Sequence, residues 1–88
     1  MDAVVVAKKY EVLVVYNGVT KPITVEPHEQ VHAVLQQAIH LFGITQNPHL
    51  LSFFKEDGTV VPENQSVADA GIKPGERLAL RPNAVKGG

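Results

Sequence analysis

The residues with the clearest chemical potential are Gly87 and Gly88, which close the sequence. Glycine lacks a Cβ and has wide φ and ψ freedom, so a Gly-Gly segment can enter a channel too narrow for other residues. The carboxylate at its end could then be presented to a site on another protein. The six residues after Pro82 span at most ~20 Å when extended. The alternative interpretation is a structureless end without a role.

Four histidines are the other candidates for site chemistry, namely His28, His32, His40 and His49. His28 and His32 are four residues apart, a spacing that places two metal ligands on one face of a helix. The sequence offers no evident third ligand, and His28 directly follows Pro27, outside the expected helix. We therefore expect solvated histidines and no metal site.

The sequence shows none of the residue arrangements typical of an enzyme. Ser52 and Ser66 lack the G-x-S-x-G context of an activated nucleophile. The acidic turn Glu56-Asp57 is most simply a solvated loop. Gly58 and Gly75 lack the spacing of a phosphate-binding loop. We expect no catalytic residue, no cofactor and no enzymatic activity.

The composition describes a short, nearly neutral chain. Its 88 residues, of which 44% are hydrophobic, fit one domain with a small core. A net charge of −1 argues against nucleic-acid binding. The chain has no cysteine, which suits a reducing compartment. Its longest apolar runs are five residues, against ~20 for a spanning helix, and Asp2 stands where a signal peptide carries basic charge. We expect a cytoplasmic protein that binds no membrane.

Two strands joined by a tight turn are expected near the start of the chain. Tyr10–Tyr16 and Val19–Val25 are rich in β-branched and aromatic residues. Between them lies Asn17-Gly18, a pair that tolerates the positive φ angles of a two-residue hairpin turn. Pro22 lacks an N–H group, so the second strand is expected at a sheet edge or at a bulge. Residues 1–9 are expected to form an N-terminal arm or an extra strand.

The next segment predicts a helix. Its apolar residues recur at intervals of three and four, which creates one apolar helix face. They are Val31, Val34, Leu35, Ala38 and Phe42. Gly43 follows where a left-handed residue commonly ends a helix.

Three further strands are expected after the helix, over residues 50–54, 59–61 and 76–81. A capped helical turn over residues 66–72 precedes the last strand. Phe53 and Phe54 are adjacent, so in a strand they face opposite sides and one of them belongs to the core. The other core residues expected from the apolar spacing are Val34, Leu35, Ala38, Leu51, Leu78 and Leu80.

These elements predict an α+β roll over residues 10–82. The helix and the sheet each have one apolar side to bury, so the helix must cover one face of the sheet. We expect a mixed sheet of about five strands packed on one main helix. The last strand has the cleanest alternation and no internal proline, so it is expected in the sheet interior beside the first strand.

This ordered set of elements resembles the ubiquitin family, and a prokaryotic ubiquitin-like modifier in particular. The resemblance covers about residues 10–88, with extra residues around positions 56–64 and after Arg81. It implies a β-grasp fold. The residues that carry it are Asn17-Gly18, residues 23–27, Val31, Val34, Ala38, Gly43-Ile44, Leu51, Phe53, residues 66–72, Leu78, Leu80 and Gly87-Gly88.

The resemblance implies a protein modifier. An activating enzyme would adenylate the carboxylate of Gly88, which would pass to a cysteine as a thioester and then to an amine of a target protein. Gly87 would give access to that carboxylate, and residues 83–88 would form a flexible Gly-Gly tail. The implied partners are an activating enzyme, a conjugating enzyme, a deconjugating isopeptidase and target proteins.

Two other functions stay open. One is a sulfur carrier, in which the same carboxylate becomes a thiocarboxylate after adenylation. The other is a docking domain that is not conjugated. The helical turn over residues 66–72 favours the modifier, because sulfur carriers that resemble this chain are usually shorter and lack it.

The resemblance also places a possible partner surface. The family's apolar recognition positions fall on Tyr16, Ser52 and Arg81, and Phe54 is a further candidate contact on the exposed sheet face. A hydroxyl and a charge stand where apolar side chains are the rule, so readers of eukaryotic ubiquitin should bind poorly. The family's chain-building lysines fall mainly on Val14, Val19, Leu35, Gln37 and Leu41, so its familiar polymer linkages are not expected.

Overall fold

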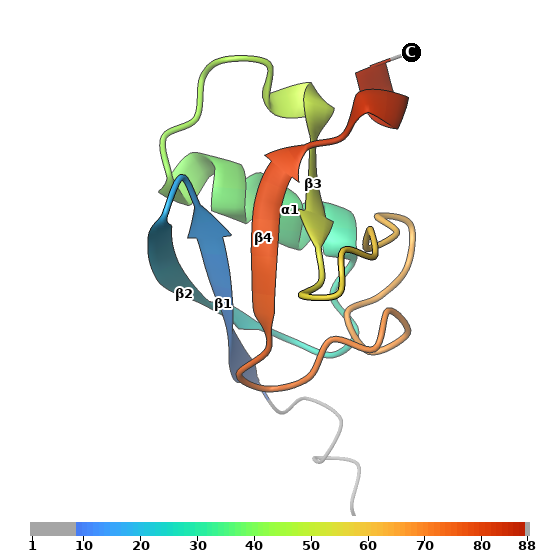
Figure 1. Cartoon of the computed structure of the whole chain (residues 1–88). Coiled ribbons are helices and arrows are strands. Elements are labelled where there is room, and N and C mark those ends of the chain that lie inside the picture. The colour runs from blue at the N-terminus through green and yellow to red at the C-terminus, as the bar shows by residue number, and fades with distance from the viewer. Residues whose placement is uncertain (1–8, 88) are drawn as a thin grey trace, which may run out of the picture.

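The computed structural model describes residues 9–87, so most of the expected N-terminal arm and Gly88 lie outside the described residues. The strands are β1 (Tyr10–Tyr16), β2 (Val19–Val25), β3 (Leu51–Phe54) and β4 (Arg77–Pro82). One α-helix, α1 (Val31–Leu41), follows β2. Two short 3-10 helices, η2 (Pro48–Leu50) and η3 (Ala84–Gly87), precede β3 and follow β4. Figure 1 shows α1 lying across one face of the sheet.

The four strands form one mixed sheet in the order β2-β1-β4-β3. β1 pairs antiparallel with β2 and parallel with β4, and β3 pairs antiparallel with β4. The α+β class, the mixed sheet and the interior position of the last strand are therefore confirmed. The expected number of about five strands is wrong, because the structure has four in the part of the chain it describes.

The missing strand is the segment over residues 59–61. It makes a single isolated bridge, between Val60 and Phe54. The backbone N–H of Val61 donates to the carbonyl of Phe53 at 2.9 Å. Pro62 follows directly and has no N–H group to donate, so the pairing cannot continue into a ladder.

The first hairpin has the predicted turn. Asn17 and Gly18 both have positive φ angles, of 50° and 78°, and Tyr16 pairs with Val19 across the turn. Pro22 belongs to β2, which is an edge strand, and it pairs with Leu13 of β1. Its missing N–H therefore weakens no interior ladder, as the sequence predicted.

Helix α1 ends in a Schellman motif. The N–H of Gly43 donates to the carbonyl of His40 at 3.1 Å, and the N–H of Ile44 donates to that of Ile39 at 3.0 Å. Gly43 has a φ of 66°, which glycine adopts without the steric cost of a Cβ. The helix start has no side-chain cap. Backbone carbonyls of the loop over residues 63–65 accept hydrogen bonds from its first N–H groups instead.

The core lies between α1 and the sheet. All of the predicted core residues, Val34, Leu35, Ala38, Leu51, Leu78 and Leu80, are buried. Phe53 is also buried whereas Phe54 is half-buried, which confirms that the two phenylalanines face opposite sides. The segment over residues 66–72 is a turn without a regular helix, in which the N–H of Asp69 donates to Ser66 Oγ at 3.0 Å.

Candidate functional site

The segment after β4 carries the proposed conjugation end. Gly87 is the last residue of η3, and Gly88 lies outside the described residues. Figure 1 shows the segment leaving β4 and turning at the end of the sheet where β3 begins. Residues 84–86 are exposed or half-buried. None of them is a core residue, so this segment can change its position without unpacking the domain.

Asn83 fixes the start of this segment. Its N–H donates to the carbonyl of Leu50 at 2.7 Å, and its side-chain amide donates to Ser52 Oγ at 3.3 Å. Its own side-chain oxygen accepts from the N–H of Val85 at 3.1 Å, as an Asx turn does. The chain therefore turns back toward β3, whereas the sequence predicted a flexible tail from residue 83 onward.

Lys86 ties the end of the segment to the body. Its ammonium donates to the carbonyl of Leu51 and to a carboxylate oxygen of Glu63. The other carboxylate oxygen of Glu63 lies 3.1 Å from Nδ1 of His32, in the first turn of α1. The side chains of Lys86 and Glu63 are 26% and 25% exposed, so the pair is partly shielded from water. We call Lys86, Glu63 and His32 the tail cluster.

The tail cluster changes the acidity of Glu63. Burial alone opposes ionisation of this carboxyl, but the hydrogen bonds and charges of Lys86 and His32 outweigh it and hold the pKa of Glu63 below its ordinary value. The carboxylate is therefore ionised at neutral pH. The contact with Lys86 is thus a charge-assisted hydrogen bond, the stronger kind.

Replacing Glu63 by Gln is expected to lower the free energy of unfolding at pH 7 by about 1 kcal/mol. Because the folded pKa is lowered, the stabilisation is complete above the unfolded pKa and is lost as the pH falls through the folded one. The difference between wild type and Glu63→Gln should therefore shrink below pH 4.5, the ordinary Glu value. Urea titrations from pH 7 to pH 3 measure it. A difference that stays constant with pH would contradict this assignment.

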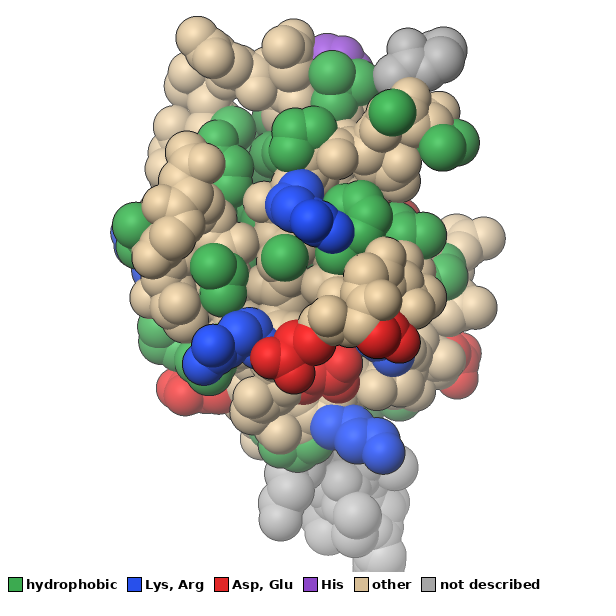
Figure 2. All heavy atoms as spheres, viewed as in Figure 1, with side chains coloured by type: hydrophobic (Ala, Val, Ile, Leu, Met, Phe, Trp, Pro, Cys, Tyr) green, Lys and Arg blue, Asp and Glu red, His purple; other side chains and the backbone are tan. Residues whose placement is uncertain are grey.

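The outer face of the sheet, opposite α1, holds the second candidate site. Strand alternation places Leu13, Val15 and Ala79 on this face, all of them half-buried. Val15 and Phe54 are both paired with Ala79, so they form a row across three strands. The guanidinium of Arg81 lies 4.4 Å from the centre of the Phe54 ring, as a cation–π contact does. Figure 2 shows apolar side chains between separate basic ones on this face.

Two of the four expected partner-surface residues do not contribute to the exposed outer face. Tyr16 is on the α1 side of β1, where its ring lies 5.5 Å from that of Phe42. Ser52 is on the outer face opposite Arg81 but is only 2% exposed, with Asn83 bonded to it. Of the expected set, the structure brings together only Phe54 and Arg81. We call these two residues with Leu13, Val15 and Ala79 the outer-face row.

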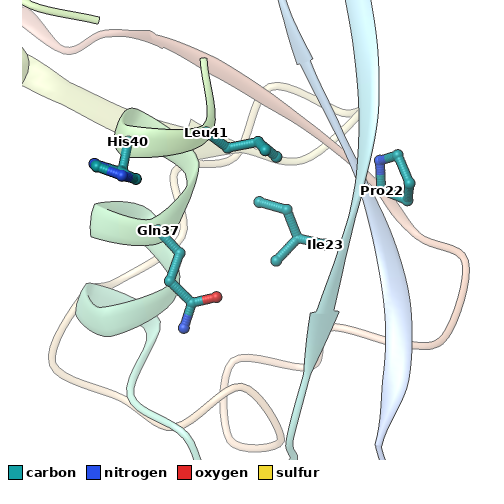
Figure 3. Close-up of a pocket in the computed structure, with 5 residues that line it drawn as sticks. All are labelled: Pro22, Ile23, Gln37, His40 and Leu41. Carbon is teal, nitrogen blue, oxygen red and sulfur yellow. The ribbon is translucent and has the colours of Figure 1, made fainter. Parts of the chain in front are cut away.

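A hollow of about 320 Å³ lies between β2 and the end of α1. Its lining residues are Pro22, Ile23, Gln37, His40 and Leu41. Figure 3 shows Ile23 and Leu41 pointing toward one another, while Pro22 lies on the other side of its strand and His40 points away. The hollow lacks converging polar groups, so it offers little to orient a small molecule.

Two of the four histidines pair with carboxylates. His28 Nε2 lies 3.1 Å from Glu26, and His32 Nδ1 lies 3.1 Å from Glu63. The two rings therefore face different partners. Within residues 9–87, no three His, Asp or Glu side chains are grouped so that they could hold a metal ion. No helix in this part of the chain is both long enough and apolar enough to cross a membrane.

Solved structures of ubiquitin and of ubiquitin-like domains share the fold of this chain. A ubiquitin of Caldiarchaeum subterraneum matches with a TM-score of 0.73, 15% identity, and coverage of 86% of this chain and 95% of that one. A protein designed on the basis of ubiquitin matches with a TM-score of 0.74, 18% identity, and coverage of 86% and 90%. The N-terminal ubiquitin-like domain of the 4931431F19Rik protein matches with a TM-score of 0.73 and 13% identity, and the match covers 88% of this chain and 77% of that one.

The ubiquitin-like fold expected from the resemblance is therefore confirmed. At identities of 13–18%, this likeness establishes the fold and not the function. A search of curated proteins found no match. The model of a protein family of unknown function, DUF2604, matches residues 6–88. The chain belongs to that family.

Proposed function

We propose that this protein is a ubiquitin-like modifier, conjugated through Gly88 to amines of target proteins. The observation that carries the proposal is the position of the Gly-Gly end on this fold. Gly87 follows β4 by a short segment that supplies no core residue. A carboxylate at Gly88, encoded there or produced by processing, would sit on a segment that an enzyme can draw out without unfolding the domain.

The proposed chemistry needs no catalytic side chain from this chain. The Gly88 carboxylate attacks the α-phosphate of ATP in the activating enzyme, and pyrophosphate leaves. A cysteine thiolate of that enzyme then attacks the acyl adenylate, and AMP leaves. After transfer to a conjugating enzyme, a target amine displaces the thiolate and loses its proton to form the amide. An isopeptidase would return the free carboxylate by hydrolysis.

The outer-face row is the docking surface we assign to the enzymes of this pathway. It combines half-buried apolar side chains with the exposed guanidinium of Arg81 over Phe54. Aromatic and arginine side chains contribute most strongly to interfaces. A matching surface would be apolar at its centre and carry a carboxylate for Arg81.

The same surface should exclude readers of eukaryotic ubiquitin. Such a reader would have to bury Arg81 without a partner, which costs an interface more than about 1 kcal/mol. We expect no measurable binding of a standard ubiquitin-binding domain in titration calorimetry, with eukaryotic ubiquitin as the positive control. Binding of this protein as tight as that of ubiquitin would refute the prediction.

The test of the function is mass spectrometry of the protein expressed with the genes that neighbour it. Lys86 directly precedes Gly87-Gly88, so trypsin should leave a Gly-Gly remnant on each modified lysine of other proteins. The expected result is such remnants, absent from a matched strain that expresses a chain without Gly88. An intact chain in which sulfur has replaced one oxygen would establish the sulfur carrier instead. If neither adduct forms and the chain without Gly88 keeps its full function in the cell, the protein is a docking domain that is not conjugated.

A further inference from the structure

Residues 83–87 do not leave the domain as an extended strand. They form a 3-10 turn whose two ends are fastened, at Asn83 to Leu50 and Ser52, and at Lys86 to Leu51 and Glu63. Ser52 is buried although it is on the outer sheet face. The segment thus packs on the start of β3 and belongs to the described fold.

This docked geometry restricts the reach of the glycines. With Lys86 fixed to Glu63, only two residues follow the fixed point, and they span about 7 Å when extended. Once the segment is released back to Pro82, six residues span ~20 Å. An enzyme channel that encloses the terminal carboxylate while excluding the globular domain needs the longer reach.

We propose that the contact of Lys86 with Glu63 and Leu51 is an autoinhibitory latch, which holds residues 83–87 against the domain until a partner opens it. This inference rests on the proposed function. The latch joins three parts of the chain, because Glu63 also binds His32 of α1. A partner that supplies its own carboxylate to Lys86, or its own cation to Glu63, would open it by exchange.

The latch is suited to opening because it is polar and only partly buried. Its two charged side chains are each about one quarter exposed, so water can replace the lost contacts. Glu63 also contacts His32 at 3.1 Å through its other carboxylate oxygen, so this carboxylate has a partner besides Lys86. Opening removes no side chain from the core, since residues 84–86 are not part of it.

Limited trypsin cleavage after Lys86 tests the latch without any partner enzyme. Trypsin must take the lysine side chain into its own pocket and hold the backbone extended, so hydrolysis of the Lys86–Gly87 bond requires the open segment. The intact mass reports the loss of two glycines. The free peptide of residues 82–88 supplies the rate for a fully open segment.

The expected result is that the wild-type protein is cleaved about tenfold or more slowly than the peptide, because cleavage follows the population of the open form. Glu63→Gln and Glu63→Ala should recover much of the peptide rate. Glu26→Gln is the matched control, since Glu26 also contacts a lysine and a histidine, Lys9 and His28. It should leave the rate unchanged.

Hydrogen exchange provides a second measurement that does not depend on trypsin. The N–H of Lys86 donates to the carbonyl of Asn83 at 3.0 Å, so it should be protected in the wild type and lose protection in both Glu63 variants. Circular dichroism shows whether these variants remain folded. Wild-type cleavage at the peptide rate, or equal rates and equal protection in wild type and variants, would overturn the latch.

The outcomes separate the latch from the function. Slow cleavage that is relieved by Glu63→Gln, without any adduct on target proteins, would keep the latch and reject the modifier. If the protein forms adducts on targets but trypsin cleaves it at the rate of the free peptide, the modifier function is supported and the latch is rejected. If the protein is a modifier and the latch also exists, Glu63→Gln should speed acyl-adenylate formation by the activating enzyme.

Discussion

Truncating Leu78 to Ala is expected to lower the free energy of unfolding by ~2–5 kcal/mol. Leu78 is fully buried near the start of β4, where it pairs with Val14 of β1. The substitution removes apolar contacts and leaves a cavity between the sheet and α1. The total free energy of unfolding of a domain of this size is ~5–10 kcal/mol, so the variant should be close to unfolding at physiological temperature.

The measurement is urea denaturation followed by circular dichroism. Leu41→Ala is the matched control, because it is the same substitution at a residue that is 43% exposed, and it should cost under about 1 kcal/mol. A loss below 1 kcal/mol at Leu78 would mean that β4 has a different register. A shift of one residue exchanges the two faces of a strand.

The elements of this fold could be predicted because each has a local signal. The Asn17-Gly18 turn, the α1 periodicity and Gly43 depend on residues close together in the sequence, and the structure confirms all three. The alternation of Leu78 and Leu80 with Arg77, Ala79 and Arg81 likewise predicts their buried face. The error in strand number came from the segment over residues 59–61. Its composition suits a strand, but Pro62 ends the pairing after one bridge.

The contacts of the C-terminal segment could not be predicted in this way. Lys86 and Glu63 are 23 residues apart, and a single polar pair leaves no periodic pattern in a sequence. Ser52 is expected on the partner surface because it matches a recognition position of the family that the chain resembles, and that match does not anticipate the C-terminal segment that folds over β3. Tyr16 was assigned by its matching position in a related fold, yet its ring packs against Phe42. The signal that sequence reasoning passed over was Asn83, a residue that favours turns.

Replacing Gly87 by Val is expected to reduce activation of the C-terminus by about 100-fold or more, as small misplacements of reacting groups do. A β-branched side chain widens the segment and restricts its backbone where a narrow channel needs glycine. Stability should change by no more than about 0.5 kcal/mol, because Gly87 lies after the last core residue. Loss of activation with an unchanged fold would locate the defect in access to the carboxylate.

The assay is ATP–pyrophosphate exchange with the activating enzyme that the proposed function requires, together with thermal unfolding of each variant. Ala68→Val is the matched control, since it adds a β-branched side chain at an exposed position within the turn over residues 66–72. It should exchange pyrophosphate at the wild-type rate. Deleting Gly88 should reduce exchange at least as strongly as Gly87→Val does, because the deletion leaves the carboxylate one residue short of the reacting phosphate. Normal exchange by both tail variants would show that the Gly-Gly end is not the reactive group.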